Sequence, residues 1–200
     1  MSIVKFKVEF RSHNPPDDAR VVELREWCNR FNQMGLTPHL QGTGRSLGNL
    51  SFRIVPMSPV FIITGSTLDS KDDLGPADFV KVIQSDPMLK TVIVEGAKDP
   101  SSESMMHYEI YNRRRDIGAI FHGHDPEITA GAALLGLPET AQEALPGTIE
   151  LLEQVMKILH DGNFLVMKNH GFLAFGKTMG AAGNLAMKIK NDLAAMRRTV

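Results

Sequence analysis

The sequence predicts an α/β domain in which helices cover the faces of a mixed or mostly antiparallel sheet. Helical and strand-like patterns alternate along most of the 200 residues, which is typical of a sheet covered by helices. Several strand-like segments follow one another across short loops, and such neighbours pair antiparallel because a parallel pair needs a long crossover. The length suits one domain, so we expect residues 1–200 to form a single unit.

The chain begins with a predicted strand and a predicted helix. Apolar and charged residues alternate from Val4 to Phe10, the pattern of a half-buried strand, and the turn-rich segment HNPPDD follows. Between Val21 and Met34, apolar residues recur every three or four positions, which predicts a helix that ends at Gly35. We expect the next segment, QGTGRSLG, to be a loop.

The remaining elements follow from the same two periodicities. NLSFRIV, VFIIT and TVIVEGA are predicted strands, and GPADFVKVIQS is predicted to be a short helix. After the turn KDPSS, a helix is predicted over residues 102–114, followed by the strand AIFHGH. EITAGAALLGL and TIELLEQVMKILHD are predicted helices, FLVMKNHG and FLAFG are predicted strands, and a closing helix is predicted over residues 179–198.

Composition and charge argue against several classes of protein. The chain is 42% hydrophobic and 22% charged with a formal net charge of -1, unlike the basic surface of a nucleic-acid-binding protein. It contains no apolar run long enough to cross a bilayer and no signal-like segment, so we expect a cytoplasmic protein without membrane partners. Cys28 is the single cysteine, so any metal must be held by histidine and carboxylate.

Two histidines close a predicted strand in the stretch GAIFHGHDPEI. Side chains at positions i and i+2 of a strand lie on one face, so His122 and His124 point into the same space. Neutral imidazole binds zinc well, and a catalytic zinc site has three protein ligands. His170, beside Gly171 in a second apolar segment, is the best third ligand. Two polar residues at a strand end are the alternative, and Asp125 is predicted to cap the next helix.

The segment DPSSES lies where a strand gives way to a helix, whose first N–H groups lack internal partners. Ser101 and Ser102 add hydroxyl donors there, which suits a phosphate, although N-capping by one serine is the alternative. Glu103 either complements the helix dipole or serves as a base or metal ligand. Two further glycine turns, GTGRSLGN and IITGS, match a backbone that approaches a ligand. The residues concerned are Gly48, Asn49, Thr64 and Gly65.

Taken in order, the segments GNLSFR, IITGS, PSSES, AIFHGH and KNHGFLAFG resemble those of the class II aldolase/adducin family, the relatives of L-fuculose-phosphate aldolase. The resemblance covers about residues 20–198 and leaves residues 1–17 as an extra N-terminal strand and turn of open position. It implies a three-layer α/β/α domain with a central, mainly antiparallel mixed sheet. It also implies a homotetramer with active sites between neighbouring subunits.

The resemblance assigns roles to the candidate residues. It implies one Zn²⁺ per subunit held by His122, His124, His170 and Glu103, a ligand set that also accepts manganese, iron or cobalt. Glu103 would in addition act as acid and base. The phosphate of a small phosphorylated sugar, or a keto-acid substrate, would bind at Gly48, Asn49, Thr64, Gly65, Ser101 and Ser102. The implied reaction is the cleavage of a carbon–carbon bond through a metal-stabilised enediolate.

The sequence departs from the family after the histidine pair. The aldolases use a tyrosine of the adjoining subunit from this region to protonate the leaving fragment, and here the region has none. Tyr108 and Tyr111, the only tyrosines, belong to an earlier helix, and Glu139 or Glu143 is a candidate replacement. An aldolase, a dehydratase, an epimerase, a decarboxylase and a non-catalytic adducin-like interaction module therefore stay open.

Overall fold

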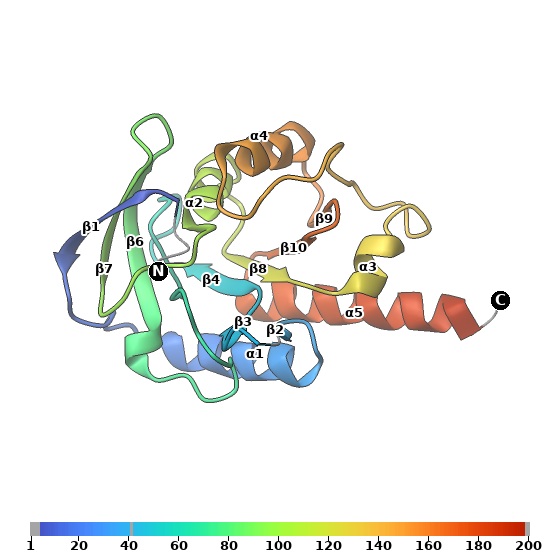
Figure 1. The fold of residues 1–200 in the computed structure, drawn as a ribbon, viewed down its shortest axis with the longest axis horizontal. Coiled ribbons are helices and arrows are strands. Elements are labelled where there is room, and N and C mark those ends of the chain that lie inside the picture. Colours follow the sequence, from blue (N-terminus) through green and yellow to red (C-terminus); the bar gives the residue numbers. More distant parts are fainter. Residues whose placement is uncertain (1–4, 41, 199–200) are drawn as a thin grey trace.

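The computed structural model describes residues 5–40 and 42–198, so Val4 of the predicted first strand and Gln41 of the predicted loop lie outside the described residues. Its framework is an eight-stranded sheet (Figure 1). The strands of this sheet are β1 (Lys7–Ser12), β4 (Asn49–Arg53), β5 (Phe61–Thr64), β6 (Phe79–Asp86), β7 (Thr91–Gly96), β8 (Ala119–Gly123), β9 (Phe164–Met167) and β10 (Gly171–Gly176). A separate ribbon joins β2 (His39–Leu40) to β3 (Arg45–Ser46).

The strand order across the large sheet is β1-β7-β6-β5-β4-β8-β10-β9. Every neighbouring pair is antiparallel except β1 and β7, which run parallel with Lys7 opposite Thr91. The prediction of a mixed, mainly antiparallel sheet is therefore confirmed. The N-terminal strand, whose place the sequence left open, lies at one edge of the sheet beside β7.

Helices cover both faces of the sheet, as the three-layer prediction requires (Figure 1). One face carries α1 (Val21–Gln33), α3 (Pro126–Ala130) and α5 (Met179–Arg198), and the other carries α2 (Ser104–Arg113) and α4 (Ile149–Ile158). Because side chains alternate along a strand, Phe121 of β8 packs in the core under α1 and α5, whereas Ile120 packs in the core under α2. Each strand of the centre is thus buried on both sides.

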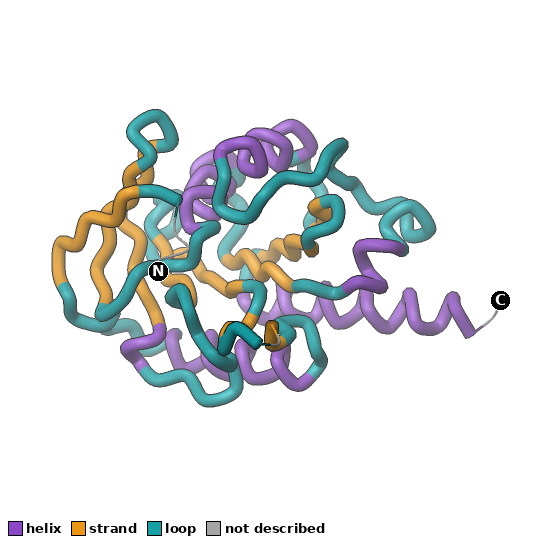
Figure 2. Tube along the Cα trace, in the orientation of Figure 1, coloured by secondary structure: helices purple, strands orange, loops and turns teal. Residues whose placement is uncertain are grey.

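Two predicted helices differ from the structure. The segment GPADFVKVIQS forms one 3-10 turn, Pro76–Asp78, and then the strand β6. Phe79, Val80 and Val82 are fully buried between β5 and β7, so pairing on both sides overrides the local helical pattern. The segment EITAGAALLGL is helical only in α3, and the chain from there to α4 is mostly loop (Figure 2). Gly131 and Gly136 interrupt that segment and weaken a helix.

The helix ends agree with the cap residues in the sequence. The Asp125 carboxylate accepts from the N–H groups of Glu127 and Ile128, which confirms its predicted capping role at α3. The Thr148 hydroxyl accepts from the N–H of Leu151 at the start of α4. Within the described part of the chain, no helix combines the length and the apolar character that a membrane span requires.

Candidate metal centre and anion pocket

Three distant segments meet because β8 lies between β4 and β10 in the sheet. The antiparallel register places Asn49 opposite His122 on one side and Phe172 opposite Gly123 on the other. The start of β4, the end of β8 and the turn before β10 therefore share one end of the sheet. His170 lies in that turn, so the pairing of strands brings it beside the histidine pair.

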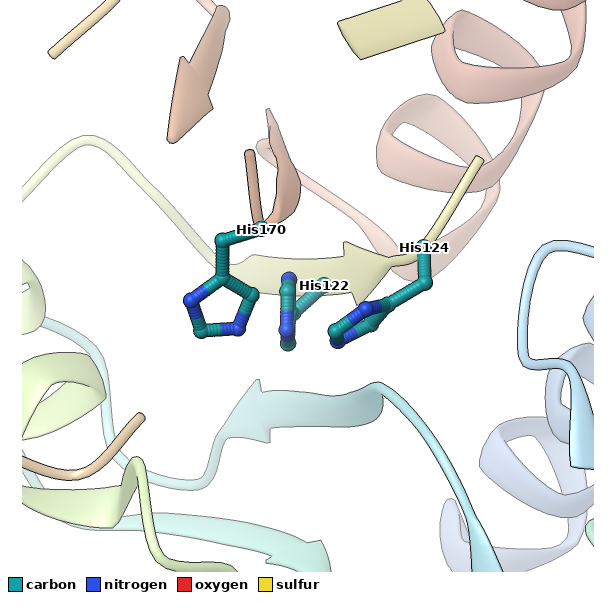
Figure 3. A group of neighbouring side chains, drawn as sticks. All are labelled: His122, His124 and His170. Carbon is teal, nitrogen blue, oxygen red and sulfur yellow. The ribbon is translucent and has the colours of Figure 1, made fainter. Parts of the chain in front are cut away.

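The three predicted histidines converge. The ring centroids lie 4.7 Å apart for His122 and His124, 5.1 Å for His122 and His170, and 4.9 Å for His124 and His170. One nitrogen from each ring lies within 4.8 Å of the others. Figure 3 shows the rings side by side, turned into one space. His122 and His124 share a face as predicted, although β8 ends at Gly123.

The backbone around these rings fixes their orientation. His122 Nδ1 lies 2.9 Å from the carbonyl oxygen of Phe172; because a carbonyl only accepts, Nδ1 carries the hydrogen and Nε2 faces the site. A Cβ at Gly171 would lie 2.4 Å from the carbonyl oxygen of Gly123 and 2.9 Å from His122 Cε1. Gly171 therefore leaves room for the ring. The tight turn itself is made by Asn169, at φ 54°.

Glu103 faces the three rings from the opposite side. Its side chain is 5% exposed, with Oε2 at 3.1 Å from His122 Nε2 and Oε1 at 3.2 Å from His170 Nε2. Asn49 Nδ2 donates to Oε2 at 2.7 Å. Glu103 stands at the N-cap position of α2, yet its side chain caps nothing. Interaction with the helix dipole alone therefore does not explain why the Glu103 carboxylate points at the histidines.

The electrostatics of the group favour a bound cation. Burial would raise the pKa of the Glu103 carboxyl, but attraction to His122 outweighs it and holds that pKa well below its ordinary value. Burial and repulsion from the neighbouring rings lower the pKa of His124 to about 2, and burial lowers the pKa of His170. Glu103 Oε1 and His122 Nε2 are buried without a hydrogen-bond partner. A carboxylate that faces ring nitrogens at this distance is stabilised by a positive charge between them, which either a proton on the ring or a metal ion would supply.

Three imidazoles and one carboxylate fit a divalent transition metal. Zinc prefers such nitrogen and oxygen donors in tetrahedral geometry, and Glu103 Oε1 and His122 Nε2 have no hydrogen-bond donor among the described residues. The arrangement is thus compatible with a metal ion. Manganese, iron and cobalt accept the same ligand types.

A buried polar network supports the helix that carries Glu103. His107, one helical turn further along α2, is fully buried, and its Nδ1 lies 2.8 Å from Ser51 Oγ. Ser51 Oγ in turn lies 2.9 Å from the Tyr111 hydroxyl. Burial lowers the pKa of His107 to about 3. Tyr111 is completely buried and packs in the core, while Tyr108 is half-buried on the same helix.

A pocket of about 480 Å³ opens beside the rings. Five of the six predicted phosphate positions line it together with Glu103: Gly48, Asn49, Gly65, Ser101 and Ser102. Thr64 does not line it, but its carbonyl accepts from the Ser101 N–H at 3.2 Å. The Gly65 N–H is engaged with the carbonyl of Asp78 at 2.7 Å. Gly48 has φ 76°, and a Cβ there would lie 2.6 Å from the His122 carbonyl oxygen.

One pocket residue has no signal in the sequence. Lys71 is 2% exposed and lines the pocket, where its Nζ donates to Ser46 Oγ at 2.9 Å. It stands in DSKDDLG, a charged stretch typical of an exposed loop. Its burial depends on contacts with a segment 25 residues away, which no local pattern predicts.

The two glutamates considered in place of the missing tyrosine lie beside β9. Glu143 Oε2 accepts from Asn169 Nδ2 at 2.9 Å, one residue before His170. Glu139 pairs with Val166 in an isolated bridge. Neither glutamate lines the pocket of the described chain.

Comparison with known proteins identifies the family. The model of the Class II Aldolase and Adducin N-terminal domain matches residues 22–195. The chain belongs to the class II aldolase/adducin family. It is 31% identical over 159 residues to the 5-methylthioribulose-1-phosphate/5-deoxyribulose-1-phosphate aldolase of Rhodospirillum rubrum, a match that covers 72% of this chain and 67% of that protein.

Two further proteins are similar to this chain over most of its length. The chain is 30% identical over 178 residues to an L-fuculose phosphate aldolase of Methanococcus maripaludis, covering 80% of this chain and 88% of that one. A solved L-fuculose 1-phosphate aldolase has a TM-score of 0.72 at 28% identity, with 94% of this chain and 89% of that chain covered. The family and fold predicted from the ordered motifs are therefore confirmed, and the expectation of an aldolase-type enzyme agrees with these relatives.

Proposed function

We propose that this protein is a zinc-dependent aldolase-type lyase that cleaves a carbon–carbon bond of a small phosphorylated ketose. The observation that carries the proposal is the convergence of His122, His124 and His170 on the buried carboxylate of Glu103. The names of the relatives, all aldolases of phosphorylated sugars, support the substrate class.

The three imidazoles and Glu103 would hold the ion. When bound, zinc supplies Lewis-acid polarisation of the ketose carbonyl and its neighbouring hydroxyl oxygen. The protein contributes the orientation of the ligands, because the Phe172 carbonyl fixes the His122 tautomer. Asn49 holds Glu103 in place through its 2.7 Å hydrogen bond.

Glu103 is the proposed acid and base. When the carbon–carbon bond breaks, its electron pair remains on the phosphate-bearing fragment, and that carbon must then gain a proton. Glu103 lines the pocket beside the rings, within reach of a fragment held there. A carboxylate held ionised by a neighbouring cation becomes an effective base only once substrate displaces it or screens that charge.

The glycine and serine turns would orient the substrate. Gly48, Ser101 and Ser102 line the same pocket as Glu103, and turns of this kind hold a phosphate through backbone N–H groups and hydroxyls. A phosphate fixed at this end keeps the reacting carbons beside the rings, which lowers the entropic cost of the reaction. Cleavage turns the hydroxyl of the leaving fragment into an aldehyde, so this hydroxyl must lose its proton. Of the two predicted replacements for the tyrosine, Glu143 is the proposed acceptor, because its Oε2 contacts Asn169, the residue before His170, from outside the pocket lining.

An adducin-like interaction module is the rival from another class. An interaction module needs no buried acceptors without donors, and Glu103 Oε1 and His122 Nε2 are two such atoms among the described residues. This favours the enzyme. We also propose the homotetramer that the family resemblance implies, to be checked by light scattering on the purified chain. A single domain over residues 1–200 and a cytoplasmic location remain predictions of the sequence.

The test combines metal analysis with product analysis. Protein purified without added zinc, then dialysed against zinc, should hold about one ion per chain. With L-fuculose 1-phosphate or 5-deoxyribulose 1-phosphate, an aldolase releases an aldehyde and a phosphorylated three-carbon ketone. A dehydratase would release water without an aldehyde, and an epimerase would leave the mass unchanged.

The His124→Ala variant should lose both the ion and the turnover, whereas His13→Ala, which alters an exposed histidine outside the site, should keep both. If wild-type protein fails to take up zinc and the His124→Ala variant behaves identically, the interaction module becomes the better account.

A further inference from the structure

One buried cation in the pocket lacks an acidic partner. Lys71 is 2% exposed, and its Nζ donates to Ser46 Oγ at 2.9 Å, to the Leu47 carbonyl at 3.0 Å and to the Ser46 carbonyl at 3.3 Å. All three acceptors are neutral, and none of the ion pairs among the described residues includes Lys71. A buried charge without a counter-charge is costly, so an anion in this pocket would stabilise it.

The acceptors of Lys71 lie directly before two of the predicted phosphate positions, Gly48 and Asn49. In a trans peptide the C=O and N–H groups point in opposite directions. Because the Leu47 carbonyl points at Lys71, the N–H of Gly48 points away from it. The opposite side of this turn is closed, since a Cβ at Gly48 would lie 2.6 Å from the His122 carbonyl oxygen. Lys71 therefore fixes the direction of a backbone donor in the turn.

The other charged groups of the pocket differ from Lys71 in burial. Lys5 is exposed and Arg45 is half-buried, so water screens both. Glu103 is engaged by the histidines and Asn49. The titratable groups that act on Lys71 are Cys28, whose pKa burial raises to about 12, and His124, whose pKa burial lowers to about 2. Neither carries a charge near neutral pH, so neither neutralises the ammonium.

We propose that Lys71 is the charge partner of the substrate's phosphate: its buried ammonium favours a doubly charged phosphate in the pocket and holds the turn at residues 46–48 in the shape that binds it. Lys71 acts through the turn and through its field, because its three N–H donors are already used. It is a positioning and specificity-determining residue. The inference rests on the proposed function for the identity of the phosphate as part of the substrate.

Two variants separate the charge from the support of the turn. Lys71→Met removes both the charge and the donors, whereas Lys71→Gln removes the charge and keeps an amide that can still donate to a carbonyl of the turn. Lys188→Met, on the surface of α5, is the control for the loss of one positive charge. Circular dichroism and zinc content establish that each variant is folded and loaded.

The probe is inorganic phosphate, titrated calorimetrically into zinc-loaded protein near pH 7. Both Lys71 variants should bind it about tenfold or more weakly than wild type, as expected for the loss of a charge-assisted interaction. Lys188→Met should bind like wild type. With a phosphorylated ketose, KM should rise by a similar factor while kcat stays within a few-fold, because the reacting atoms lie at the histidines.

The pH profile gives a readout that support of the turn alone would not change. Burial lowers the pKa of Lys71 to about 8, so phosphate affinity of the wild type should fall as pH rises from 7 to 9. That fall should be absent in Lys71→Met, whose affinity is already low.

Phosphate affinity of Lys71→Gln equal to that of wild type would overturn the inference. If wild type also turns over a phosphorylated ketose, the proposed function stands without it. Wild-type protein that holds zinc but binds no inorganic phosphate would overturn the inference and the phosphate part of the proposed function together.

Discussion

The strongest prediction concerns Glu103→Gln, which replaces a carboxylate by an amide of the same shape. The Glu103 oxygens face the ring nitrogens of His122 and His170 at 3.1 and 3.2 Å. The amide oxygen can still accept from Asn49, and the new NH₂ group can donate to one of the ring nitrogens. The variant therefore exchanges a buried charge for a hydrogen bond.

The magnitudes follow from this exchange. Removing a buried charge that has one hydrogen-bond donor and gaining one hydrogen bond should stabilise the metal-free protein by about 1–2 kcal/mol. For a chain of this length that corresponds to a rise in Tm of roughly 2–8 °C. Loss of the acid and base should lower kcat by about 10²–10⁴-fold. Three imidazoles remain, so zinc should still bind at one ion per chain, although less tightly.

Three measurements on the same preparation decide the matter: differential scanning calorimetry after chelation, zinc content after dialysis, and kcat with a phosphorylated ketose. The expected pattern is a higher Tm without metal, retained zinc and greatly reduced turnover. A kcat within tenfold of wild type would remove Glu103 from the chemistry. A Tm of the metal-free variant below that of metal-free wild type would show that the buried Glu103 charge does not destabilise the protein.

Three further predictions concern the same end of the sheet. Burial lowers the pKa of His107 to about 3, against about 6.5 in the unfolded chain, so the unfolded state binds more protons between these pH values and the free energy of unfolding falls as pH drops. Measured by urea unfolding, His107→Gln should lose about 2–3 kcal/mol less stability than wild type between pH 6.5 and 4.5. Equal losses would contradict the burial of the ring. Gly171→Ala should reduce zinc content and lower the free energy of unfolding by about 1–3 kcal/mol, because its Cβ would lie 2.9 Å from His122 Cε1. The control, Gly162→Ala, should change zinc content little, because a Cβ there meets nothing within 4 Å. Equal zinc content in both variants would refute the packing constraint. Free zinc at about a thousand times its Kd should stabilise wild type by roughly 4 kcal/mol, and a thermal scan in which His122→Ala gains the same shift would place the ion elsewhere.

The sequence predicted most of the strands and the pairing of His122 with His124 because each depends on short-range pattern. The alternation of AIFHGH places His122 and His124 on one face once the strand exists, and burial on both sides of β8 follows from its apolar neighbours. The third proposed ligand, His170, required a different inference because it is distant in sequence. It was predicted because a catalytic zinc site needs a third protein ligand, and the structure places it in the turn before β10, beside β8.

Other features depend on pairing that no local pattern specifies. The β6 segment was predicted to be a helix, yet its residues are buried between two strands that lie before and after it in the chain. Thr64 was predicted to be a phosphate position; in the structure it lies outside the pocket lining, and its carbonyl accepts from the Ser101 N–H. Lys71 was missed altogether, because its position between charged residues of a loop gives no sign that its side chain turns inward.

The placement of the site follows from the topology of the sheet and not from any one motif. A strand that has antiparallel partners on both sides ends where both partners begin, so the end of β8 is surrounded by the start of β4 and the turn into β10. Rigid strands therefore supply Asn49 and His122, while the flanking turns supply His124 and His170. The start of α2 then adds Glu103 from the layer above. The packed core of the sheet therefore fixes the geometry of the site. Gly171→Ala keeps every proposed ligand but alters the contact between β8 and β10, so it tests whether this packing controls the chemistry.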